Sequence, residues 1–189
     1  MQSVDKELIE KFKNGSMEAF EQVVRRYQQY AFRIAYGILG NDRDAEDMVQ
    51  EAFITVYYKI SGLRNPQAFP TWLAKIVTNL CLRTSEKSDK STILSLESVE
   101  NTPINSSAAN DVYRQSDTRQ DVHRAILNLP ADYRTVVVLR DLQGYSYDEI
   151  AEIIDVPVGT VKSRIHQART LLAEILRPPG KKGGSKLEM

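Results

Sequence analysis

The chain has 189 residues and carries 25 basic and 25 acidic side chains, so its formal net charge is zero. A neutral protein has no global positive field for gripping nucleic acid, which leaves local patches or a partner to supply any DNA affinity. Its single cysteine excludes an internal disulfide framework, and no cysteine and histidine cluster offers a zinc site. Because no apolar run reaches membrane-spanning length, we expect a cytoplasmic protein that does not insert into a membrane. We also expect it to use no cofactor.

Helical periodicity extends over residues 4–83, without the alternation of apolar and polar residues that is typical of strands. The expected helices cover residues 4–13, 17–40, 44–60 and 70–83. Asn14 and Gly15 form a natural stop for the first helix, and Gly40 stops the second. Each later helix has an apolar side, so we expect them to pack around a common core.

The third predicted helix begins with a cluster of acidic residues. Carboxylates at a helix start interact favourably with the helix dipole. Farther along, Asp47, Gln50 and Glu51 form a polar side of this helix. An acidic surface repels phosphates, so it suits a contact with a protein better than a contact with DNA. Without support from other motifs, the favoured interpretation of this side is an ordinary solvated helix face.

The composition changes after Arg83. The following residues, to about Ser116, are rich in Ser, Asn and Asp and have little apolar periodicity, as a flexible linker has. Helical periodicity then returns from Asp117, and Gly144 ends a helix that starts at Pro130. We therefore expect an all-α protein of two small helical domains joined by a flexible linker. The expected ranges are 1–84 for the N-terminal domain, 85–116 for the linker, 117–177 for the C-terminal domain and 178–189 for a flexible tail.

The segment SYDEIAEIIDVPVGTVKSRIHQAR, residues 146–169, predicts a helix-turn-helix. Ser146 and Glu149 have the spacing of a capping box, which starts a helix. Pro157 ends one helix and is favourable in the first turn of the next. In the second helix a continuous apolar stripe recurs at steps of three and four, which buries one side. The stripe consists of Val158, Val161, Ile165, Ala168 and Leu172.

The remaining sides of this second helix carry hydrogen-bonding and cationic groups that suit base edges and phosphates. They are Thr160, Lys162, Ser163, Arg164, His166, Gln167 and Arg169. A single cation there would usually be part of a solvated surface. The complete pattern of capped helix, proline turn and striped helix is more specific, and it predicts DNA binding.

Three motifs occur in one order along the chain: DAEDMVQEAFITVY at 44–57, FPTWLAKIVTNLC at 69–81 and LPADYRTVVVLRDLQGYSYDEIAEIIDVPVGTVKSRIHQAR at 129–169. With them the chain resembles an extracytoplasmic-function (ECF) sigma factor of bacterial RNA polymerase. The resemblance implies a protein that binds core RNA polymerase, recognises the minus-35 and minus-10 promoter elements and promotes DNA opening. Such a protein carries out no covalent chemistry, and an anti-sigma factor usually holds it inactive.

The resemblance also assigns roles to residues. Polymerase binding, to the clamp helices of the largest subunit, falls to Asp47, Gln50 and Glu51. Minus-35 binding falls to Thr160, Lys162, Ser163, Arg164 and Gln167, where the glutamine stands in place of a common basic residue. Minus-10 binding falls to Phe69, Asn79 and Arg83. Phe69 and Asn79 would form a pocket for a base flipped from the non-template strand, although Phe69 could equally belong to the core. After Asn79 the segment NLCLRTSEKSDK has fewer cations than the family pattern, which puts strong phosphate contact there in doubt.

Two other classes of function compete with this interpretation. A stand-alone helix-turn-helix regulator would bind an operator as a dimer, yet no ligand-binding or receiver-like domain is visible. An enzyme would need a catalytic group, yet His123 and His166 have no companion nucleophile and no glycine-rich phosphate loop is present. We therefore expect no small-molecule substrate. Trp72 lies on an apolar stripe, so packing is its first expected role and contact with melted DNA its second.

Overall fold

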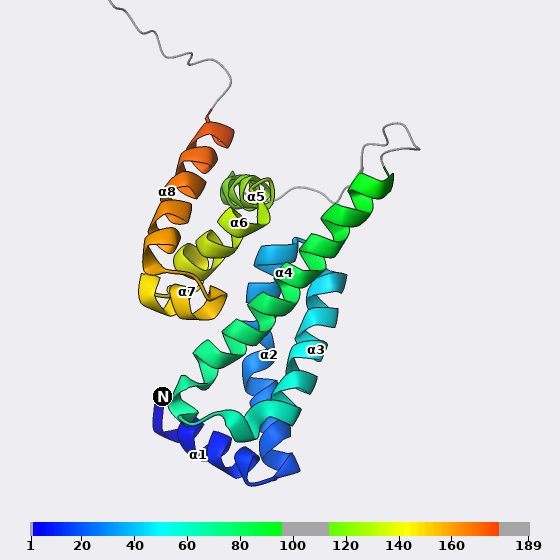
Figure 1. The fold of residues 1–189 in the computed structure, drawn as a ribbon, viewed down its shortest axis with the longest axis vertical. Helices are drawn as coiled ribbons and strands as arrows, with labels where there is room; N and C mark the ends of the chain where they lie inside the picture. Colours follow the sequence, from blue (N-terminus) through cyan, green and yellow to red (C-terminus); the bar gives the residue numbers. More distant parts are fainter. Residues whose placement is uncertain (1, 96–113, 178–189) are drawn as a thin grey trace, which may run out of the picture.

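The computed structural model describes residues 2–95 and 114–177, and across these residues it contains helices and no strands (Figure 1). The expected all-α fold is confirmed. The α-helices are α1 (Gln2–Lys13), α2 (Met17–Leu39), α3 (Asp42–Lys59), α4 (Phe69–Ser95), α5 (Arg114–Leu127), α6 (Ala131–Val137), α7 (Tyr147–Ile154) and α8 (Val158–Ile175). Two 3₁₀ turns, Ile60–Gly62 and Pro66–Ala68, precede α4, and a π-helical turn, Val138–Leu142, follows α6. Within the described part, none of the helices combines the length and apolarity needed to cross a membrane.

Helices α2, α3 and α4 lie side by side, and α1 crosses one end of this bundle (Figure 1). The ends of α2 follow local chemistry. The Ser16 hydroxyl accepts a hydrogen bond from the Ala19 amide at 3.2 Å, which caps the helix start. At the other end Gly40 adopts a left-handed φ of 80°, and its amide donates to the Tyr36 carbonyl at 2.8 Å. The sequence pattern located both ends.

Helix α4 extends to Ser95, beyond the end near Arg83 that its apolar pattern predicts. The extra turns have no apolar stripe, but they contain neither glycine nor proline. Adding a residue to an existing helix costs little, so a polar segment without a helix breaker can continue it. The predicted linker, 85–116, therefore overlaps α4 at its start and α5 at its end. Its middle, 96–113, lies outside the described residues, as does the predicted tail, 178–189.

In the C-terminal half α5, α6 and α7 all contact α8, with α5 and α6 on one side of it and α7 near its N-terminal end (Figure 1). After α6 the backbone widens into the π-turn, in which the Gln143 amide donates to the Val138 carbonyl at 3.0 Å. Gly144, with φ of 81°, then ends the helical segment, as its position in the sequence predicts.

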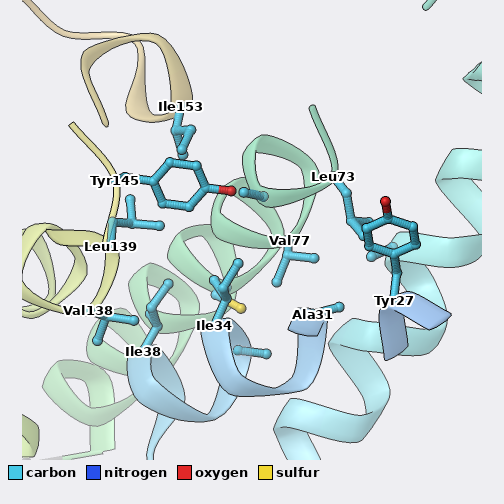
Figure 2. Close-up of a cluster of buried hydrophobic side chains, with 14 of the residues drawn as sticks. Tyr27, Ala31, Ile34, Ile38, Leu73, Val77, Val138, Leu139, Tyr145 and Ile153 are labelled. Atoms are coloured by element: carbon cyan, nitrogen blue, oxygen red, sulfur yellow. The ribbon is translucent and has the colours of Figure 1, made fainter. Parts of the chain in front are cut away.

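The two halves share one apolar core (Figure 2). Ile34 and Ile38 of α2 face Val138 and Leu139 of the π-turn, and all four side chains are fully buried. Glycine at 37 allows this approach, because a Cβ there would stand 2.9 Å from Cγ1 of Val138. Residues on both sides of the predicted linker are therefore buried against each other.

Gly40 provides a measure of this close approach. A Cβ at Gly40 would stand 2.5 Å from Cδ2 of Leu127 in α5, whereas one at Gly15 would meet nothing within 4 Å, although Gly15 has a similar φ of 92°. We expect Gly15→Ala to lower the free energy of unfolding by about 1 kcal/mol, the cost of a left-handed alanine. Gly40→Ala should cost about 1–3 kcal/mol more, because its methyl group also overpacks Leu127. Urea unfolding of both variants measures the difference, and equal losses would contradict contact between the halves.

Candidate nucleic-acid interface

The helix-turn-helix forms as its sequence predicts. The Ser146 hydroxyl accepts from the Glu149 amide at 3.2 Å, and the Glu149 carboxylate accepts from the Ser146 amide at 2.8 Å. This reciprocal pair satisfies two amides that a helix start leaves free. Helix α7 then ends at Asp155, whose φ of 56° is left-handed, and α8 starts directly after Pro157. Aspartate tolerates this conformation better than most residues, so the tight turn needs no glycine.

Helix α8 buries its apolar stripe and exposes the polar residues beside it. Val161, Ile165 and Ala168 are at most 2% exposed, and the stripe ends in half-buried residues. Among the candidate DNA-binding residues, Lys162, Ser163 and Gln167 are exposed, while Thr160 and Arg164 are half-buried. These five side chains share the N-terminal part of one helix. Thr160, Ser163, Arg164 and Gln167 recur at steps of three and four and lie on one side of α8, whereas Lys162 lies on another exposed side.

Residues of α6 hold two of these side chains in place. An Arg164 guanidinium nitrogen lies 2.6 Å from a carboxylate oxygen of Asp132, and the Tyr133 hydroxyl donates to Gln167 Oε1 at 2.8 Å. Both ends of each pair are limited in rotation before any ligand arrives, which reduces the entropy lost on binding. Sequence reasoning missed Asp132 and Tyr133, because no spacing rule relates α6 to a helix thirty residues later.

Only two of the three predicted minus-10 residues lie on the same side of α4. Asn79 is half-buried and Arg83 is exposed, and their spacing of four residues puts them on one side of α4. Phe69 is 0% exposed and packs edge-on against Tyr27, with ring centroids 5.0 Å apart. It supports the start of α4 from inside and offers no free ring face to a nucleotide in this arrangement. It also starts the helix about 15 Å along the axis from Asn79.

A cavity of about 420 Å³ lies beside the start of α4, and it shows side chains that sequence reasoning missed. Its wall from the N-terminal half includes Arg64, Asn65, Trp72 and Lys75. Trp72 is half-buried, so it both packs on the core and faces this cavity. Two cations and an amide around an indole are groups that contact phosphates and bases. The only sequence signal for Arg64 and Lys75 was their nearness to the tryptophan.

The acidic side of α3 is exposed. Asp47, Gln50 and Glu51 all lie on the surface, and Gln50 also lines an apolar groove between α2 and α3. Two side chains of this groove, Ile54 and Tyr58, are 59% and 77% exposed. Exposed apolar groups next to polar ones are typical of protein-binding surfaces. The sequence pattern placed most apolar residues of this helix in the core, so it missed the groove.

Comparison with known families gives two separate matches along the chain. The family profile for sigma-70 region 2 matches residues 23–90, and the profile for sigma-70, region 4 matches residues 119–172. The ECF RNA polymerase sigma factor SigW of Bacillus subtilis (strain 168) is 36% identical over 185 residues, which cover 94% of this chain and 99% of SigW. The ECF RNA polymerase sigma-E factor of Escherichia coli (strain K12) is 36% identical over 186 residues, covering 94% of this chain and 96% of that protein.

The chain belongs to the ECF family of RNA polymerase sigma factors. The region 2 match takes in α3 and most of α4, and the region 4 match takes in the helix-turn-helix. Family membership therefore disfavours a stand-alone helix-turn-helix regulator.

Solved structures agree on the fold of this sigma factor. CnrH, in a complex with the cytosolic domain of CnrY, has a TM-score of 0.66 at 22% identity, over 91% of this chain and 96% of that one. The sigma factor RpoE from Bartonella quintana, in a complex with the anti-sigma factor NepR, has a TM-score of 0.66 at 24% identity, over 87% of this chain and 100% of that one. At these identities the likeness concerns the arrangement of helices alone.

The capping box gives a direct test of the helix-turn-helix geometry. We expect Ser146→Ala to lower the free energy of unfolding by about 1 kcal/mol, because it removes the acceptor for the Glu149 amide. Thr170→Ala is the matched control, since its exposed hydroxyl bonds only to the His166 carbonyl inside α8. That control should change stability by less than about 0.5 kcal/mol. A neutral Ser146→Ala in thermal or urea unfolding would contradict the reciprocal cap.

Proposed function

We propose that this sigma factor directs core RNA polymerase to promoters by reading a minus-35 element with α8 and a minus-10 element with the region around α4, and that it promotes duplex opening there. The observation that carries the proposal is the polar surface of α8, where five candidate contact residues follow a capped α7 and a tight turn. It fits a helix that enters the major groove with its N-terminal residues toward the bases.

On this surface the side chains divide by chemistry. Lys162 is exposed and has no fixed donor geometry, so it suits a phosphate. Arg164 presents a planar guanidinium that can bind a guanine edge through two hydrogen bonds, and Gln167 can do the same with adenine. In the free protein their partners Asp132 and Tyr133 keep both side chains at the surface of α8.

For the minus-10 element we propose Asn79 and Arg83 together with the cavity beside Trp72. An indole surface and an amide can offset the few kcal/mol that extrusion of a base costs. Arg64 and Lys75 would add phosphate contacts, which would make up for the scarcity of cations after Asn79. Phe69 would act indirectly, by supporting the loop that ends at α4.

Polymerase binding is proposed for α3. Asp47, Gln50 and Glu51 would contact the clamp helices of the largest subunit, and the apolar groove that contains Gln50 would bury a neighbouring apolar side chain of the same partner. This arrangement combines an apolar centre with a polar rim. The protein would then be cytoplasmic, use no cofactor and carry out no covalent chemistry. An anti-sigma factor that covers these surfaces would keep it inactive.

Run-off transcription tests promoter reading. The purified protein is mixed with core polymerase and a library of templates with randomised promoter positions. We expect Arg164→Ala to relax the preference at one minus-35 position by about 1–3 kcal/mol, whereas Lys162→Ala weakens all templates about equally. A specific gel shift by the protein alone, as tight as that with core polymerase, would contradict the sigma mechanism. So would an unchanged base preference in Arg164→Ala.

Polymerase binding is tested separately by co-purification with core polymerase. We expect Ile54→Asp to reduce retention at least about tenfold, because it puts a charge into an apolar contact. Asp47→Lys should also reduce retention, by reversing the charge of the rim. Thr170→Asp, on exposed α8, is the control and should bind as the unaltered protein does. Full retention of both α3 variants would contradict polymerase binding through this surface of α3.

A further inference from the structure

The first turn of α6 lies beside two of the candidate base-reading residues of α8. Helix α6 packs against α8 (Figure 1), and its adjacent residues Asp132 and Tyr133 contact Arg164 and Gln167 respectively. Because Arg164 and Gln167 are three residues apart, they lie on the same side of α8, one turn above the other. One turn of a helix outside the helix-turn-helix therefore orients two consecutive candidates for base contact.

The contact with Asp132 leaves Arg164 free to bind a base. A guanidinium carries five N–H groups, and here one terminal nitrogen lies 2.6 Å from a carboxylate oxygen of Asp132. The side chain of Arg164 is 25% exposed and that of Asp132 is 55% exposed, so the pair lies at the surface of the helix. The remaining N–H groups are sufficient for the two hydrogen bonds that an arginine makes to guanine. Asp132 thus limits the rotation of Arg164 and does not use up its donors.

The contact with Tyr133 has a different consequence for Gln167. A glutamine amide has one oxygen, which accepts hydrogen bonds, and one nitrogen, which donates two. The Tyr133 hydroxyl donates to Oε1 of Gln167 at 2.8 Å. This bond holds Oε1 toward α6, so Nε2 points to the other side of the amide. Gln167 therefore offers a base its two donors, and its acceptor is already engaged.

The edges of the purines differ in what they require from such a side chain. In the major groove adenine presents an acceptor at N7 and a donor at its N6 amino group, whereas guanine presents acceptors at both N7 and O6. The two-bond contact of glutamine with adenine uses Oε1 and Nε2 together. With Oε1 held by Tyr133, the amino group of adenine meets no free acceptor, and an unpaired donor at an interface is costly. Both acceptors of guanine, by contrast, suit the free N–H groups.

We propose that Tyr133 is a positioning residue that sets the base specificity of Gln167, by holding its amide so that it donates to guanine and disfavours adenine. The inference rests on the proposed promoter-reading function and deepens it, because it names the base that Gln167 selects. Tyr133 acts through Gln167 and needs no DNA contact of its own. The first turn of α6 thereby becomes part of the minus-35 reader.

Run-off transcription with core polymerase tests this role. The templates carry a randomised minus-35 element and a transcribed barcode, which is counted by sequencing. Gln167→Ala identifies the position that Gln167 reads, as the position at which base preference is lost. There we expect the unaltered protein to prefer guanine to adenine. Tyr133→Phe removes the hydroxyl alone and frees Oε1, so it should raise the ratio of adenine to guanine at this position about fivefold, the effect of one hydrogen bond.

Two controls separate positioning from a structural role. Tyr36→Phe removes the hydroxyl of another half-buried tyrosine, one that belongs to α2 and stacks on His123 with ring centroids 5.1 Å apart. It should leave every base ratio unchanged. Tyr133→Phe combined with Gln167→Ala should show the base ratios of Gln167→Ala alone, because the hydroxyl acts only through the amide. A merely structural Tyr133 would lower transcription from all templates together and leave their ratios unchanged.

Three results would overturn the inference: a preference for adenine in the unaltered protein, an unchanged ratio in Tyr133→Phe, or no position at which Gln167→Ala loses base preference. Failure of the sigma function itself gives a different result, namely no transcript from the unaltered chain with core polymerase. Urea unfolding then still tests the contact in the free protein. The Tyr133–Gln167 bond should couple the two substitutions at least about twofold in the unfolding equilibrium constant, and additive effects would contradict it.

Discussion

The close packing of α2 against the π-turn determines how the rest of this molecule is arranged. Gly37 lets Val138 approach the α2 backbone, and the apolar side chains on both sides exclude water from the contact. Buried apolar area of this kind is the main stabilising contribution in a small domain. Each half is small, so the area that the halves bury against each other adds substantially to what either could bury alone. The polar contacts at the edge then fix the relative orientation rather than supply the stability.

Local rules accounted for most of the fold. Ser16, Gly40, Gly144 and the Ser146–Glu149 pair each act through neighbours in the chain, so their effect on helix ends can be read from spacing alone. The end of α4 was not predictable in this way, because a polar helix without a stripe has no period to detect. The contact between the halves depends on side chains more than one hundred residues apart, such as Tyr30 and Tyr145, and a single sequence carries no signal for it.

The candidate site shows the same division. Thr160, Ser163, Arg164 and Gln167 share one helix at steps of three and four, so periodicity places them on a common side, and α8 forms over these residues. Phe69, by contrast, was assigned from a motif, and a motif does not indicate whether a ring faces solvent or core. The neutral net charge conceals local groups of charge, with exposed cations on α8, acidic residues on α3, and residues of both signs at the cavity beside Trp72. The fold determines which charged residues become neighbours, and composition alone does not predict this.

The π-turn at Val138–Leu142 has a consequence for how this chain tolerates insertion and deletion. A π-turn holds one residue more than an α-turn between its hydrogen-bonded groups, as the bond from Gln143 to Val138 shows. Loss of one residue there would restore a regular helix and rotate everything after it by about 100°. Tyr145 would then leave Tyr30, and the helix-turn-helix would be presented in a new direction. The length of this short segment, more than its composition, therefore sets the register between the two DNA-reading parts.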